Sequence, residues 1–123
     1  MQGTFIHWCI HVLDLEKSLE FYEKALGYAV HHTMGPEDGS WSNTFMAAPG
    51  CPFELELTWN RGRTEEYENG GMDCHIAFRV DDIGRYHELH ERMGCIQKEN
   101  PKMGLYFIVD PDGQRIEILP ERA

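Results

Sequence analysis

The segment His7-Trp-Cys-Ile-His-Val-Leu-Asp14 returns later in the chain as His75-Ile-Ala-Phe-Arg-Val-Asp-Asp82. The two segments share histidine, valine and aspartate at a constant offset of 68 residues. Each is followed by a helix-like stretch that ends at a glycine, Gly27 in the first half and Gly94 in the second. A strand-like segment followed by a helix-like one, occurring twice, indicates a duplicated structural module.

Apolar residues at regular spacing predict the elements of the first module. Alternation over Thr4–Val12 predicts a strand, and His7 lies on its more polar face. The opposite face, which can pack under a helix, carries Ile6, Trp8, Ile10 and Val12. A helix capped by Asp14 and stopped by Gly27 follows. Three further strands are expected at Tyr28–Thr33, Trp41–Ala47 and Phe53–Trp59.

The second module repeats this order after a linker-like segment at residues 60–73. A strand over Cys74–Val80 leads to a helix capped by Asp81 or Asp82. Two later strands, Leu105–Val109 and Gln114–Leu119, are joined by the turn sequence Asp110-Pro-Asp-Gly113. The sequence therefore predicts an α+β fold of two tandem βαβββ modules, at about 4–60 and 74–120, within a single domain 1–123.

Composition limits the classes of function. With 123 residues and 41% hydrophobic content, the chain can fold as one ordinary domain. Its formal net charge of −10 argues against nucleic acid and anionic membranes as partners. No signal-like or membrane-spanning apolar segment is evident, and the four cysteines form no CxxC pair. We therefore expect a cytoplasmic protein with reduced thiols.

Each module also carries one histidine and one glutamate that could meet. Glu56 lies between two leucines and Glu117 between two isoleucines, so both carboxylates should face away from the core. His7 and His75 are expected on that same face. Burying a carboxylate costs several kcal/mol unless an opposite charge compensates it. A divalent metal would compensate both carboxylates and orient both imidazoles, so the sequence predicts a metal site.

The donor types limit the metal but do not define it. Imidazole and carboxylate without thiolate suit Ni²⁺, Co²⁺, Zn²⁺ or Fe²⁺, and four ligands leave positions for water or substrate. Glu54 shares the face of Glu56 and is an alternative ligand. His31 and His32 are expected to be ordinary surface residues. His11 and Arg79, each four residues after a metal-candidate histidine, are candidates to contact an anionic substrate group.

Four motifs carry a resemblance to a known family. They are His7-x4-Val-x-Asp-Leu-x2-Ser-Leu-x-Phe-Tyr-x3-Leu-Gly27, Glu56-Leu-Thr-Trp-Asn60, His75-Ile-Ala-Phe and Asp110-Pro-Asp-Gly-x2-Ile-Glu117. Together they resemble the glyoxalase I family of the vicinal-oxygen-chelate superfamily, over nearly the whole chain. The last motif is typical of the superfamily fold, whereas Glu-Leu-Thr-x-Asn points more narrowly to glyoxalase I.

The resemblance implies a lactoylglutathione lyase-like enzyme whose mixed sheets form an open barrel around a metal. It implies that the metal ligands are His7, Glu56, His75 and Glu117, with Glu117 as general base and Glu56 as the second catalytic carboxylate. The substrate would be the hemithioacetal of methylglyoxal with a small thiol, glutathione being favoured, and the product a lactoyl thioester. Ni²⁺ or Co²⁺ is favoured over Zn²⁺, and a homodimer with ligands from both subunits is implied.

Substrate contacts and alternatives complete the expectations. His11, Asn60, Arg79 and Lys102 are the expected substrate-binding residues, with Arg79 able to replace an arginine that many members carry where this chain has His11. A second reading is another metalloenzyme on the same scaffold: an epimerase, a thiol transferase or a dioxygenase. A third reading is a metal-free module that binds a drug, which predicts that Glu56 and Glu117 can be replaced without effect.

Overall fold

The computed structural model describes residues 1–71 and 73–122. Met72, which belongs to the predicted linker, and Ala123 lie outside the described residues. Among the described residues, none of the helices combines the length and the apolar character needed to cross a membrane. The chain divides into two compact units, Met1–Tyr67 and Glu68–Ala123, each described here by itself.

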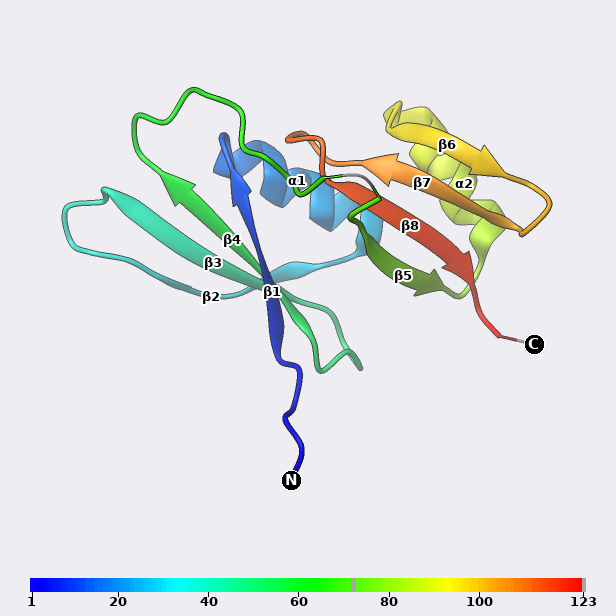
Figure 1. Ribbon diagram of the computed structural model, residues 1–123, viewed down its shortest axis with the longest axis horizontal. Helices are drawn as coiled ribbons and strands as arrows, with labels where there is room; N and C mark the ends of the chain where they lie inside the picture. Colours follow the sequence, from blue (N-terminus) through cyan, green and yellow to red (C-terminus); the bar gives the residue numbers. More distant parts are fainter. Residues whose placement is uncertain (72, 123) are drawn as a thin grey trace. The chain divides into compact units, whose positions relative to one another are not determined.

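The first unit contains one helix and a four-stranded mixed sheet (Figure 1). Its elements are β1 (His7–Val12), α1 (Leu15–Leu26), β2 (Ala29–Met34), β3 (Trp41–Ala47) and β4 (Glu54–Asn60). The strand order is β1-β4-β3-β2. The outer strand β1 runs parallel to β4, whereas β4, β3 and β2 are antiparallel neighbours. The first and last strands of the module therefore lie side by side.

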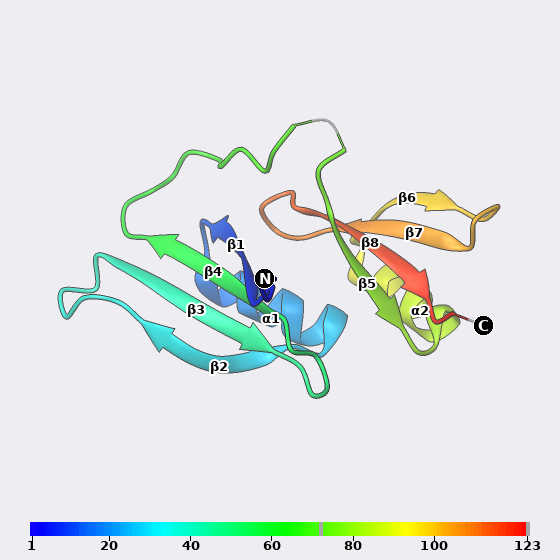
Figure 2. The same cartoon turned by 60° about the horizontal axis from the view of Figure 1, so that its bottom comes forward.

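The second unit has the same order of elements and the same topology, seen again from another side in Figure 2. Its elements are β5 (Ile76–Val80), α2 (Ile83–Met93), β6 (Ile96–Asn100), β7 (Leu105–Val109) and β8 (Arg115–Pro120). The strand order is β5-β8-β7-β6, with β5 parallel to β8. The predicted α+β class with two βαβββ modules is confirmed. That the modules form a single domain stays a prediction.

Both helices begin and end at the residues that their sequences indicate. The Asp14 carboxylate accepts a hydrogen bond from the backbone N–H three residues later, and Asp82 does the same for α2. Gly27 and Gly94 follow the last helical residues with φ of 70° and 69°, a left-handed conformation that glycine adopts without steric cost. Of the two caps predicted for α2, the structure selects Asp82.

The repeated βαβββ order requires a strand after α2, but no residue range is predicted for β6. Its sequence, Ile96-Gln-Lys-Glu-Asn100, has a single apolar residue and no alternation of apolar and polar side chains. It lies at the edge of its sheet, paired with β7, where one face and one edge are open to water. Polar side chains are tolerated there, so hydrophobic periodicity carries no signal for this strand.

Side chains along β4 and β8 point alternately to the core and to the opposite face of the sheet, where the candidate site lies. Leu55, Leu57, Ile116 and Ile118 are fully buried. The glutamates between them are only partly buried, because successive side chains of a strand point to opposite faces. Thus the inner strands of both sheets present an apolar face to the core and a carboxylate to the other side.

The apolar face predicted for β1 is only half buried. Ile10 and Val12 are 5% and 1% exposed, as expected of core residues. Ile6 and Trp8 remain 59% and 45% exposed, so only the second half of the face that can pack under a helix is buried. Phe5, just before it, is also exposed and stacks on Phe53 with ring centroids 4.9 Å apart. The start of the chain therefore presents apolar side chains to solvent.

Candidate metal and substrate site

In the first unit, β1 and β4 bring His7 and Glu56 together. The Nε2 atom of His7 lies 3.7 Å from a carboxylate oxygen of Glu56. The Cα partner of Glu56 in the parallel ladder is Cys9, so the histidine stands two residues before that partner on the same face of its strand. The Glu56 side chain is only 13% exposed, while that of His7 is 37% exposed. The pair is thus accessible mainly from the imidazole side.

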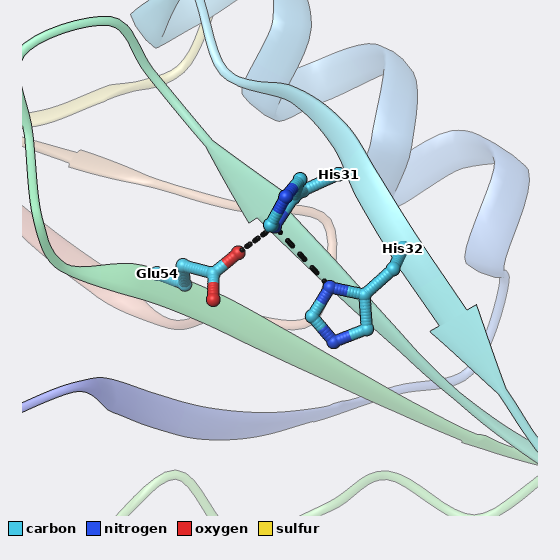
Figure 3. A group of neighbouring side chains, drawn as sticks. All are labelled: His31, His32 and Glu54. Carbon is cyan, nitrogen blue, oxygen red and sulfur yellow. Dashed lines mark hydrogen bonds and ion pairs between the residues drawn. The ribbon is translucent and has the colours of Figure 1, made fainter.

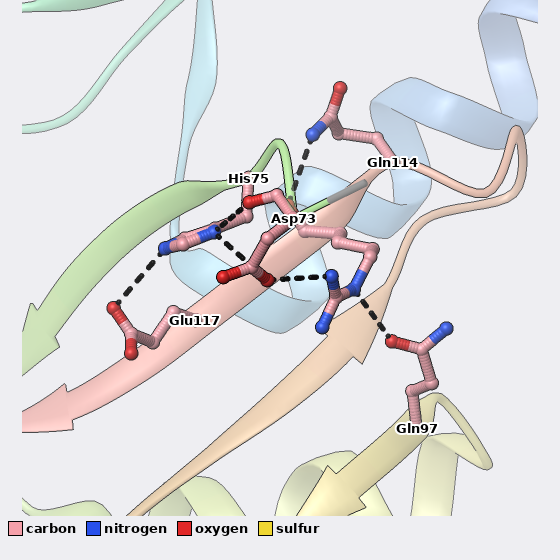
Figure 4. Close-up of polar contacts among 6 residues, drawn as sticks. Asp73, His75, Gln97, Gln114 and Glu117 are labelled. Carbon is pink, nitrogen blue, oxygen red and sulfur yellow. Dashed lines mark hydrogen bonds and ion pairs between the residues drawn. The ribbon is translucent and has the colours of Figure 1, made fainter. Parts of the chain in front are cut away.

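In the second unit, the same arrangement brings His75 and Glu117 together. The Nε2 atom of His75 lies 3.6 Å from a carboxylate oxygen of Glu117, and Figure 4 shows the two side chains pointing toward each other. The Cα partner of Glu117 is Ala77, again two residues after the histidine. His75 lies just before β5, which begins at Ile76 rather than at the predicted Cys74. The diagonal register is identical in the two units.

A phenylalanine supports each pair from the neighbouring strand. Phe45 is the Cα partner of Glu56, and its ring meets the His7 ring edge-on, with centroids 5.4 Å apart and an interplanar angle of 83°. Phe107 is the partner of Glu117 and meets His75 at 5.3 Å and 84°. Sequence reasoning missed both rings, because nothing local distinguishes them from other strand aromatics. Each unit therefore builds the same three-residue cluster.

The second pair has an outer layer of polar contacts (Figure 4). The Nδ1 atom of His75 lies 2.7 Å from the Asp73 backbone carbonyl oxygen, which can only accept, so Nδ1 carries the proton. Arg115 donates to the Asp73 carboxylate at 2.9 Å and to the Gln97 side chain at 3.0 Å. These contacts leave the lone pair of His75 on Nε2, the atom that faces Glu117. Such outer contacts commonly fix metal-ligating histidines.

Each His–Glu pair fits a divalent metal. An ion with bonds of about 2.1 Å separates neighbouring ligand atoms by roughly 3.0–3.6 Å. The observed separations of 3.7 and 3.6 Å are close to that range without adjustment of the backbone. Imidazole nitrogen and carboxylate oxygen are the donors that first-row divalent ions accept. The residues present in each unit can therefore supply two ligands.

Glu54, the alternative ligand, is engaged elsewhere. Its carboxylate lies 2.7 Å from Nδ1 of His31 on β2, not beside His7. Although the backbone of Glu54 is the ladder partner of His7, the side chain of His7 reaches forward to Glu56. The two carboxylates of β4 thus serve two different histidines.

Two of the predicted substrate-binding residues meet at a third residue that the sequence did not indicate. The His11 ring packs against the Tyr67 ring with centroids 5.1 Å apart, and the Asn60 side-chain amide donates to the Tyr67 hydroxyl at 3.3 Å. The guanidinium carbon of Arg63 lies over the Tyr67 ring, 4.3 Å from its centroid. Tyr67 belongs to residues 60–73, whose composition is typical of a linker, so nothing in the sequence indicated that it lies near the substrate-binding residues.

The other two predicted substrate-binding residues belong to the second unit. Arg79 donates from Nη1 to the backbone carbonyl of Pro120 at 2.8 Å, within its own sheet. Lys102 lies in the turn between β6 and β7 and is exposed. The Pro120 carbonyl accepts one N–H of the Arg79 guanidinium. To bind an anionic substrate group, Arg79 would have to donate with its other N–H groups.

Cys9 lies beside the first pair and is exposed. Its sulfur is 3.2 Å from the Thr58 hydroxyl. Desolvation raises the pKa of the Cys9 thiol above its usual range, the Thr58 hydrogen bond opposes this change, and the Glu56 carboxylate adds to it. A raised pKa disfavours the thiolate, the form in which cysteine is nucleophilic.

Comparison with known families agrees with this arrangement. The model of the Glyoxalase/Bleomycin resistance protein/Dioxygenase superfamily matches residues 4–118. The match extends over both modules and both His–Glu pairs. The chain belongs to this superfamily, as its motifs predicted.

Within the superfamily, the chain is similar to lactoylglutathione lyases. It is 32% identical to that of Escherichia coli O157:H7, over 95% of this chain and 92% of the relative. It is 30% identical to that of Haemophilus influenzae, over 96% and 93%. The solved trypanothione-dependent glyoxalase I of Leishmania major is 31% identical, with a TM-score of 0.85 over 98% of this chain and 88% of that one. The prediction of a lactoylglutathione lyase-like enzyme is confirmed at this level.

Proposed function

We propose that this enzyme isomerises the hemithioacetal of methylglyoxal and a small thiol to a lactoyl thioester, and so detoxifies methylglyoxal. The observation that carries the proposal is the duplicated His–Glu pair, with separations of 3.7 and 3.6 Å, in a chain similar to lactoylglutathione lyases. Two identical half-sites in one chain are what a shared four-ligand centre requires. We assign that centre to His7, Glu56, His75 and Glu117.

The bound ion is proposed to be Ni²⁺ or Co²⁺ rather than Zn²⁺. A divalent ion at these ligands would polarise the substrate oxygens and stabilise negative charge on them. The low exposure of Glu56 and Glu117, 13% and 19%, favours binding because partly desolvated carboxylates gain most from a cation. His75 is held for this task through its Nδ1 contact with Asp73.

Glu117 is proposed as the general base and Glu56 mainly as a ligand. The two glutamates differ in the ladder partner beside them. Glu56 stands next to the Cys9 thiol, a hydrogen-bond donor, whereas Glu117 stands next to the methyl group of Ala77. A carboxylate without that donor keeps more of its acceptor capacity for a substrate proton. Glu117 would remove the proton from the carbon that bears sulfur, the former aldehyde carbon of methylglyoxal, and return it to the adjacent ketone carbon.

The thiol moiety is proposed to lie against His11, Asn60, Arg79 and Lys102. Tyr67 joins this set because it contacts both His11 and Asn60. Glutathione is the favoured thiol, although the similar protein from Leishmania major is trypanothione-dependent. All four cysteines are free thiols, which supports a cytoplasmic location.

An assay with methylglyoxal and a panel of thiols tests the reaction. Protein stripped of metal by a chelator should be inactive with every thiol. Activity should return with Ni²⁺ or Co²⁺, more than with Zn²⁺, and should be highest with glutathione. The measurement is the rate of thioester formation with glutathione, trypanothione or no thiol. Turnover that needs neither thiol nor metal would contradict the proposal.

A homodimer with active sites between subunits is part of the same proposal. Each unit supplies one histidine and one glutamate and has its own core. The exposed apolar residues Phe5 and Ile6, just before β1, and Trp8 within it support burial against a second copy, because soluble monomers rarely leave such side chains clustered in water. In that arrangement the first unit of one subunit would complete its site with the second unit of its partner.

Replacing Trp8 by glutamine should weaken the dimer and lower activity in parallel. Trp8 is 45% exposed, so the folded chain loses little internal packing, whereas an interface would lose an aromatic anchor. Light scattering at several protein concentrations gives the mass, with activity measured on the same samples. Met103→Gln, at a 69% exposed apolar residue in the β6–β7 turn, is the control and should change neither. A fully active monomer would rule out the shared site.

A further inference from the structure

A β-bulge in β2 places two adjacent histidines on one face of the first sheet. Val30 pairs with Met46 and His32 with Phe45, so His31 is an extra residue in the ladder between β2 and β3. In a regular strand His31 and His32 would point to opposite faces. The bulge changes the direction of one of these side chains, so that both lie on one face. Bulges often have this effect next to functional sites.

The Glu54 carboxylate of β4 completes a cluster with these histidines (Figure 3). The Nδ1 atom of His31 lies 2.7 Å from Oε2 of Glu54 and 3.2 Å from Nδ1 of His32. A proton on His31 can bridge to Glu54, but that nitrogen then has no lone pair for His32. One proton therefore satisfies only one of the two contacts, whereas a cation would satisfy both.

We propose that His31, His32 and Glu54 bind a second divalent metal ion, of the borderline class that imidazole prefers, with Zn²⁺ as its probe. An ion with bonds of about 2.1 Å separates neighbouring ligand atoms by roughly 3.0–3.6 Å, and the 3.2 Å between the two nitrogens falls in that range. The 2.7 Å contact between Glu54 and His31 would have to lengthen slightly, and all ligand atoms of the cluster lie within 4.8 Å of one another. Three protein ligands leave at least one open position.

The second unit shows that the bulge alone does not make this site. Its edge strand has the same register shift, between Ile96 and Lys98, with Gln97 as the extra residue. The position equivalent to Glu54, two residues before the site glutamate, is Arg115, which donates to the Gln97 side chain at 3.0 Å. A guanidinium and an amide form a hydrogen bond there but offer no metal site. The bulge therefore occurs in both units, whereas, among the described residues, side chains that could bind a metal at it occur only in the first unit.

The proposed second site is separate from the His7–Glu56 pair but adjoins it. Phe45 stacks on His32, with ring centroids 4.3 Å apart and an interplanar angle of 15°, and meets His7 edge-on. An ion that fixes the His32 ring would therefore also restrict the ring that supports His7. The His31 side chain is 64% exposed, so the ion should exchange freely with solvent.

Zinc binding can be measured in a protein whose first site is disabled. The variant His7→Gln with His75→Gln lacks both imidazoles of the proposed catalytic centre. It should still bind about one Zn²⁺ per chain in equilibrium dialysis, and zinc should shift the ring NMR signals of His31 and His32. Adding His31→Gln or Glu54→Gln should weaken this binding at least tenfold, about 1.4 kcal/mol. Circular dichroism should show that both exposed-site variants remain folded.

The matched control is His87→Gln in the same background. Like His31, His87 contacts a glutamate, Glu99. The aromatic ring that packs against His87 is that of Tyr106, whereas His31 has a second imidazole beside it. Zinc binding should be unchanged in this control. If the background variant binds no Zn²⁺, or if His31→Gln and Glu54→Gln bind it as tightly as their parent, the second site does not exist. That outcome is independent of whether the wild-type protein turns over methylglyoxal.

Discussion

Replacing Glu117 by glutamine is expected to lower turnover by at least about 10²-fold while metal stays bound. Glutamine keeps an oxygen that can ligate the metal but cannot accept the substrate proton. The measurement is kcat at saturating metal, together with the metal content of the same preparation. A loss of kcat without loss of metal assigns Glu117 to proton transfer rather than to metal binding alone.

Glu56→Gln is the matched comparison, because Glu56 has the same register, a phenylalanine partner and a histidine neighbour like those of Glu117. It should mainly weaken metal affinity and recover most activity when metal is saturating. If the two variants behave alike, or if Glu56→Gln is the inactive one, the assignment of roles is wrong although the metal centre would stand. The comparison also tests the contribution of Cys9 and Ala77, the differing neighbours of these glutamates.

Replacing His75 by alanine is expected to weaken binding of the tightly held ion by more than about 100-fold, since even loss of a residue that only supports a ligand costs 10- to 100-fold. Activity at limiting metal should fall with it. Metal analysis after dialysis against a weak chelator gives the content of tightly bound ion. The parent should hold about one ion per chain, because each chain has four ligands and each centre needs four. His7→Ala should have the same effect.

His11→Ala is the control for these histidine variants. His11 lies on the same strand and the same face as His7, but its ring packs against Tyr67 instead of approaching Glu56. It should keep the tight ion and change only the KM for the thiol adduct. Retention of full metal affinity by His75→Ala would show that the four-ligand centre is misassigned.

Much of the fold could be predicted because its signals are local. Asp14, Gly27 and Gly94 mark helix ends through hydrogen bonds and backbone angles that depend on a few neighbouring residues. Alternation around Glu56 and Glu117 depends only on the two-residue period of a strand. The failure at β6 follows from the same reasoning, since an edge strand in water needs no apolar face.

The sequence by itself determined two modules, their helix limits, and the identity of one histidine and one glutamate in each. The tertiary structure decided that Glu56 faces His7 while Glu54 faces His31, that a bulge turns His31 and His32 to one face, and that Tyr67 joins His11 to Asn60. These facts depend on register between strands that are far apart in the chain. Register is set by pairing and packing across the whole sheet, so no local pattern of residues contains it.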